Sequence, residues 1–69
     1  MTDLIVRTDG PAGLITLNRP KALNALTWEM CLEIETTLIK WRDDPTVQII
    51  IIDGAGDRAF CSGGDIAEM

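Results

Sequence analysis

The segment Val47–Asp53 constrains the fold most, because it is a short and almost wholly apolar run that contains four consecutive isoleucines, Ile49–Ile52. Isoleucine is β-branched and favours extended backbone. A strand that is apolar on both faces is typical of a parallel sheet covered on both sides. We therefore predict a strand over residues 47–53 that is buried on both faces and belongs to an α/β fold.

Two further strand-like segments precede this run. Leu4–Thr8 and Leu14–Asn18 are rich in aliphatic and β-branched residues. The dense turn signal Asp9–Gly13 separates them, so we predict an antiparallel hairpin with a loop of about five residues. Pro20 ends the second strand, because proline has no N–H to donate to a strand ladder.

One amphipathic helix is predicted between the hairpin and the apolar strand. The hydroxyl of Thr27 can accept a hydrogen bond from the first helical turn, and Asp43–Pro45 ends the helical pattern. The apolar positions step by three or four residues and so share one helical face. They are Leu26, Met30, Ile34, Leu38 and Trp41. Strand, helix and strand over Leu14–Asp53 then form one right-handed βαβ unit.

Composition and charge exclude several classes of function. Six Lys and Arg stand against eleven Asp and Glu, so the chain lacks the basic surface that nucleic acid requires. Histidine is absent, and the two cysteines, Cys31 and Cys61, do not have zinc-ligand spacing; we expect reduced thiols and no metal site. No apolar run is long enough to span a membrane. The start has no basic or apolar leader, which predicts a cytoplasmic protein.

We expect residues 1–69 to be one piece of a single domain with no internal boundary. A strand buried on both faces needs a covering layer on each side, and this sequence supplies one complete helix. The Gly-rich loop Gly54–Gly64 leads into the expected start of another helix, and the sequence given reaches its last residue, Met69, soon afterwards. The sequence therefore predicts a fragment of a longer chain, or else a small domain that a partner chain completes.

The segment Ser62–Asp65 is the candidate site for chemistry. Two glycines before a helix start leave backbone N–H groups open to an anion, and the helix dipole adds positive potential. Such a corner can polarise a carbonyl group, although glycine pairs are also common as plain turns and Asp65 fits a helix N-cap. Ser62 has no histidine to serve as its base. The residues alone thus predict an α/β segment in which backbone N–H groups before a helix can stabilise an oxyanion.

Two segments resemble the signatures of the crotonase (enoyl-CoA hydratase/isomerase) superfamily. They are Asn18–Leu26, NRPKALNAL, and Ala59–Ile66, AFCSGGDI. The resemblance covers essentially the whole chain and implies the N-terminal part of a spiral of ββα turns: a hairpin, a helix, a buried strand and a Gly-rich loop that opens a helix. The GGDI of Gly63–Ile66 is most similar to the 3-hydroxyisobutyryl-CoA hydrolase branch, whereas hydratases more often show GADI.

The resemblance also implies roles for individual residues. The backbone N–H of Gly64 would be one of two oxyanion-hole donors to a thioester carbonyl. The CoA moiety would lie between two short segments, with Ala22, Leu23 and Ala25 on one side and the backbone of Ser62, Gly63, Gly64, Asp65 and Ile66 on the other. The second donor and the acid/base carboxylate would lie later in the chain. No cofactor is implied beyond coenzyme A as part of the substrate.

The first function that this resemblance implies is hydrolysis of 3-hydroxyisobutyryl-CoA to 3-hydroxyisobutyrate and CoA in valine catabolism. One alternative is an enoyl-CoA hydratase/isomerase. The other is a non-catalytic small domain that binds CoA or a protein, if the chain ends at Met69. The expected partners are an acyl-CoA substrate and either further copies of the chain or the remaining part of the same protein. Neither nucleic acid nor a membrane is expected.

Overall fold

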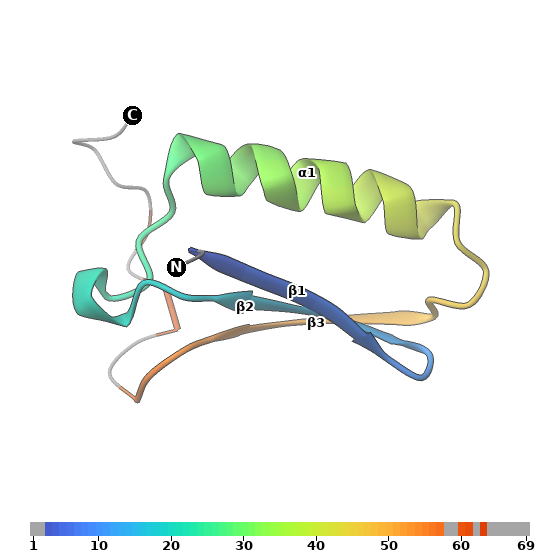
Figure 1. Cartoon of the computed structure of the whole chain (residues 1–69), viewed down its shortest axis with the longest axis horizontal. Coiled ribbons are helices and arrows are strands. Elements are labelled where there is room, and N and C mark those ends of the chain that lie inside the picture. The colour runs from blue at the N-terminus through green and yellow to red at the C-terminus, as the bar shows by residue number, and fades with distance from the viewer. Residues whose placement is uncertain (1–2, 58–59, 62, 64–69) are drawn as a thin grey trace.

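A computed structural model describes residues 3–57, 60, 61 and 63. In chain order their elements are the strands β1 (Leu4–Asp9) and β2 (Ala12–Leu17), the 3₁₀ turn η1 (Pro20–Ala22), the helix α1 (Trp28–Arg42) and the strand β3 (Ile49–Gly54). The strands form one sheet in the order β1-β2-β3, and α1 lies over one face of it (Figure 1). The predicted order of hairpin, helix and strand is confirmed.

The hairpin is tighter than the sequence indicated. β1 and β2 pair antiparallel along their full length, so that Asp9 faces Ala12 and only Gly10 and Pro11 remain in the turn. Gly10 has a φ of +59°, in the left-handed region that glycine adopts at low cost and that two-residue hairpin turns use. The predicted loop of about five residues is wrong, because the residues that flank Gly10 and Pro11 continue the strand ladder.

β3 completes the predicted βαβ unit. It runs parallel to β2, with Ala12 opposite Ile49 and Leu17 opposite Gly54. The strand begins at Ile49 rather than at Val47, because the N–H of Val47 donates to the carbonyl of Asp44 in the preceding turn.

The isoleucines of β3 are more exposed than the sequence predicted. Their exposed fractions run from 40% at Ile52 to 53% at Ile49. Within the described residues β3 is an edge strand that pairs only with β2, and α1 is the one α-helix available to cover the sheet. The prediction of a strand buried on both faces is therefore wrong for this part of the chain. The parallel pairing that was predicted together with this burial is confirmed.

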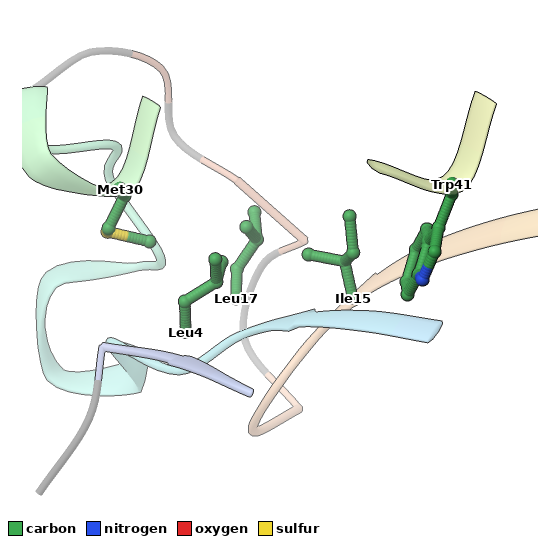
Figure 2. Close-up of a cluster of buried hydrophobic side chains, with 5 residues drawn as sticks. All are labelled: Leu4, Ile15, Leu17, Met30 and Trp41. Carbon is green, nitrogen blue, oxygen red and sulfur yellow. The ribbon is translucent and has the colours of Figure 1, made fainter. Parts of the chain in front are cut away.

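The hydrophobic core lies between α1 and the strands β1 and β2 (Figure 2). Its buried side chains are Leu4, Ile15, Leu17, Met30 and Trp41. Figure 2 shows the strand side chains pointing toward the helix and Met30 and Trp41 pointing back toward the sheet. Leu26, Ile34 and Leu38 pack against this cluster at its margin. The predicted apolar face of the helix is thus confirmed.

Both predicted helix ends are also confirmed. The Thr27 hydroxyl accepts a hydrogen bond from the Met30 N–H at 3.1 Å, which satisfies one of the free donors of the first turn. At the other end the helix stops at Arg42, and Asp43 is the C-cap. Among the described residues no helix combines the length and the apolar character that crossing a membrane requires.

Trp41 packs directly onto the backbone of β2 at Gly13. A Cβ atom built on Gly13 would lie 2.6 Å from Cζ3 of Trp41, far inside van der Waals contact. Glycine at this position therefore allows the indole ring to approach the sheet closely.

Replacing Gly13 by alanine is expected to destabilise the protein by about 1–3 kcal/mol, the usual cost of overpacking a core. Chemical denaturation measures this free energy of unfolding. In a Trp41→Leu background the same substitution should cost much less, because the ring that the new methyl group meets is gone. Equal costs in both backgrounds would contradict the packing argument.

The turn between α1 and β3 is organised by Asp44. Its Oδ1 accepts hydrogen bonds from the Thr46 hydroxyl at 2.7 Å and from the Thr46 backbone N–H at 2.9 Å. These bonds favour the ionised carboxylate, so they hold the pKa of Asp44 below its ordinary value of 3.8. Asp44 follows the C-terminal end of α1, and Figure 1 shows that this end of the helix is remote from η1. We therefore assign Asp44 to the turn.

We expect the stabilisation of the fold by the ionised Asp44 carboxylate to disappear in acid. A carboxyl group with a lowered folded-state pKa stabilises the fold above its ordinary pKa of 3.8, and it loses that effect as the pH falls through the lowered value. Thr46→Val removes the hydroxyl donor and should raise the pKa of Asp44 toward 3.8. An NMR titration of the Asp44 carboxyl carbon measures the change, with the exposed Thr8→Val as the matched control. An unchanged pKa in Thr46→Val would refute the assignment.

Candidate functional site

The loop between β2 and α1 contains unusual backbone. Leu23 and Asn24 have φ values of +53° and +56°, so two consecutive non-glycine residues are left-handed. Such residues cost on the order of 1–3 kcal/mol each and persist where the surrounding structure holds them. Asparagine tolerates this region better than leucine does. Backbone of this kind concentrates at functional sites, which draws attention to residues 18–26.

The side chain of Asn24 holds this loop from inside. Asn24 is fully buried, and its Oδ1 accepts a hydrogen bond from the Arg19 N–H at 2.9 Å. Its Nδ2 donates to the Ala55 carbonyl at 2.9 Å, just beyond the end of β3. The backbone N–H of Asn24 also donates to the Arg19 carbonyl at 2.8 Å. One side chain thereby ties the loop to a segment 31 residues further along the chain.

Arg19 closes the same loop from its other side. Its Nη1 donates to the carbonyl of Ala25 at 2.8 Å. The guanidinium of Arg19 therefore links the beginning of the loop of residues 18–26 to its end at Ala25. Together with Asn24 it fixes the backbone of Ala22, Leu23 and Ala25, the residues that the sequence predicted to contact CoA.

The two sequence signatures meet at one hydrogen bond. The backbone N–H of Leu26 donates to the Gly63 carbonyl at 2.8 Å. Gly63 has a φ of +109°, a conformation that favours glycine, and its N–H lies 3.4 Å from the Sγ of Cys61. The structure thus brings the loop of residues 18–26 beside Gly63.

The predicted site residues fall into two groups. Ala22 and Leu23 are half-buried, Ala25 is buried, and Gly63 is exposed. The second group lies outside the described residues and comprises Ser62, Gly64, Asp65 and Ile66. The helix expected to open near them lies outside as well.

Close packing requires glycine at the end of β3 and just beyond it. A Cβ on Gly54 would lie 2.5 Å from the Phe60 carbonyl oxygen and 2.7 Å from the Nδ2 of Asn24. Gly56 has a φ of +81°, and its Cβ position lies 3.0 Å from Pro20. The sequence analysis did not predict this close packing. The available signal was Gly54 and Gly56, at the end of an apolar strand and just beyond it, because glycine in a strand often marks a close approach of backbone.

A pocket of about 560 Å³ opens beside the loop. It is lined by Asp3, Asn18, Arg19, Pro20, Lys21 and Ala22. Its volume lies within the range of about 300–1,000 Å³ that is usual for small-molecule sites. Within the described residues no cluster of His, Cys, Asp and Glu could hold a metal ion. The lining thus combines an acidic and two basic side chains, Asp3, Arg19 and Lys21, with the small apolar Pro20 and Ala22.

Comparison with known proteins identifies relatives over nearly the whole chain. The family model for enoyl-CoA hydratase/isomerase matches residues 12–69. The human mitochondrial 3-hydroxyisobutyryl-CoA hydrolase is 53% identical over 64 residues, which cover 93% of this chain and 17% of the human protein. The Xenopus laevis protein of the same name is 58% identical over 57 residues, 83% of this chain and 15% of that protein.

Solved structures share the fold. An enoyl-CoA hydratase from Rhodobacter sphaeroides matches with a TM-score of 0.93 and 53% identity, over 99% of this chain and 20% of that one. A carnitinyl-CoA dehydratase from Mycobacterium thermoresistibile matches with a TM-score of 0.91 and 43% identity, over 94% of this chain and 19% of that one. The predicted α/β class, as part of a crotonase fold, is confirmed.

The expected cytoplasmic location is wrong. The curated relatives from chicken, zebrafish, cattle and human are named as mitochondrial proteins. The prediction depended on the first few residues of the sequence, and the chain spans only 17% of the length of these relatives.

The family assignment depends on both sequence and structure. The match over residues 12–69 includes β2, α1, β3 and both signature segments. The shared backbone extends over the hairpin as well, because the Rhodobacter structure covers 99% of the chain. This chain therefore belongs to the enoyl-CoA hydratase/isomerase family, within the crotonase superfamily.

Proposed function

We propose that this chain forms part of an acyl-CoA thioester site in a longer protein. We propose further that this protein hydrolyses 3-hydroxyisobutyryl-CoA to 3-hydroxyisobutyrate and CoA, the step expected in valine breakdown. The observation that carries the proposal is the hydrogen bond from Leu26 to Gly63, which sets the loop of residues 18–26 against the Gly-rich segment. The choice of reaction is supported by relatives of that name at 53% and 58% identity.

In this proposal the CoA moiety lies along Ala22, Leu23 and Ala25, and the thioester carbonyl points at the backbone N–H of Gly64. Attack by water turns that carbonyl into an oxyanion. Backbone donors that are already in position stabilise the oxyanion, and the loss of one such donor costs about 2.7–4 kcal/mol. The second donor and the general base belong to the part of the protein beyond this chain. No cofactor is required besides the CoA of the substrate.

A second candidate reaction is the hydration of an enoyl-CoA. It is favoured by the solved structure of an enoyl-CoA hydratase that is 53% identical to this chain. The two reactions share the need for an oxyanion site but differ in their products. Hydrolysis releases the thiol of CoA, whereas hydration removes the absorbance of the conjugated enoyl thioester and releases no thiol.

The test is a thiol-release assay of the full-length protein that carries this chain, with 3-hydroxyisobutyryl-CoA as substrate. We expect thiol release from the wild type. Gly64→Pro removes the proposed donor and should lower kcat by about 10²–10³-fold. Gly64→Ala retains the N–H and serves as the matched control, with the melting temperature of each variant checked.

An unchanged kcat in Gly64→Pro would contradict the oxyanion assignment. Loss of enoyl absorbance without thiol release in the wild type would instead favour the hydratase. The 69-residue chain alone is expected to release no thiol, since it would lack the second donor and the base.

A further inference from the structure

Asn24 lies at a junction of three backbone segments. Its side-chain amide bonds the Arg19 N–H, at the start of the loop, and the Ala55 carbonyl, just after β3. The third segment is the backbone at Phe60. A Cβ on Gly54 would contact both the Nδ2 of Asn24, at 2.7 Å, and the Phe60 carbonyl oxygen, at 2.5 Å. The amide, the end of β3 and the chain at residue 60 are therefore packed at one point.

This junction lies between the two predicted walls of the site. Leu23 and Ala25, the immediate neighbours of Asn24, belong to the wall proposed to contact CoA. Gly63 follows Phe60 by three residues and is bonded through its carbonyl to the N–H of Leu26, two residues after Asn24. The hydrogen bonds of Asn24 to Arg19 and Ala55 therefore lie between Leu23 and Ala25 on one side and Phe60 and Gly63 on the other.

We propose that Asn24 is a positioning residue, which keeps the CoA-binding wall in register with the Gly-rich wall that receives the thioester carbonyl. The inference rests on the proposed function. Asn24 is fully buried, so it acts through Leu23, Ala25 and the backbone near Phe60 rather than by touching substrate. Binding energy gained along CoA accelerates the reaction only if it places the carbonyl correctly, and a misplacement of 1 Å can cost about 10²-fold in rate.

A purely structural role and a positioning role predict different substrate dependence. If Asn24 only stabilises the fold, its loss lowers the active fraction and affects every thioester equally. If Asn24 keeps the two walls in register, its loss lowers kcat/KM only for substrates that contact both walls. A truncated thioester that lacks the nucleotide gains little from the CoA wall, so its reaction should be insensitive to Asn24.

The experiment uses the full-length protein with two substrates, 3-hydroxyisobutyryl-CoA and the N-acetylcysteamine thioester of the same acid. Asn24→Gly removes the amide while still permitting the left-handed backbone. We expect kcat/KM for the CoA thioester to fall by about 10²-fold. The kcat/KM for the truncated thioester should stay at the wild-type value.

Two further variants make the comparison decisive. Gly54→Ala places a methyl group between Asn24 and Phe60 and should reproduce the selective loss. Ile15→Val removes a methyl group from the fully buried core on β2 and is the control for simple destabilisation. It should affect both substrates equally. If Asn24→Gly yields no folded protein, Gly54→Ala tests the positioning role through the same comparison of kcat/KM on the two substrates.

Equal losses on both substrates in Asn24→Gly or Gly54→Ala would overturn the positioning role while leaving the proposed function intact. A selective loss on the CoA thioester supports it. A wild-type protein that releases thiol from neither substrate would overturn the proposed function itself, and this inference with it.

Discussion

The parallel pairing of β3 with β2 is the constraint on which the rest of the structure depends. Parallel neighbours end at the same edge of a sheet, and here Leu17 lies opposite Gly54. The pairing is continued by the Ala55 N–H, which donates to the Leu17 carbonyl at 2.7 Å. It is reinforced within the strands by the Thr16 hydroxyl, which donates to the Asp53 carboxylate at 2.6 Å. The chain therefore leaves β2 at Asn18 and β3 at Ala55 at the same edge of the sheet.

This common edge explains why two segments more than thirty residues apart lie against each other. In α/β sheets, the region beyond the carboxyl ends of the strands is the usual location of ligands. Here the loop after β2 and the segment after β3 are joined there by two bonds, from Asn24 to Ala55 and from Leu26 to Gly63. The strained backbone of Leu23 is held by this framework. The helix α1 contributes by packing its buried face onto β1 and β2.

Local sequence patterns predicted the parts of the fold that depend on nearby residues. The cap at Thr27 and the apolar face of α1 require only the spacing of residues along one helix. The hairpin turn was misjudged, because Gly13 resembled a turn residue although its role is to admit the ring of Trp41. The burial of the isoleucines in β3 depends on what covers the sheet, and no local pattern contains that information.

The role of Asn24 could not be predicted from its neighbours for a similar reason. One of its partners is Ala55, and the tight contact between them depends on Gly54. An asparagine among small apolar residues resembles an ordinary loop residue until its partners are known. The family resemblance suggested which segments and residues contact CoA, but it did not indicate what holds those segments in register.

We propose that residues 22–26 and the Gly-rich segment after β3 are the two walls of one acyl-CoA site. Hydrogen exchange of the full-length protein, with and without a non-hydrolysable thioether analogue of 3-hydroxyisobutyryl-CoA, tests it most directly. The account predicts slower exchange on binding in both segments, with no change in the last turn of α1 around Trp41. Binding of the analogue without added protection in either segment would contradict the account.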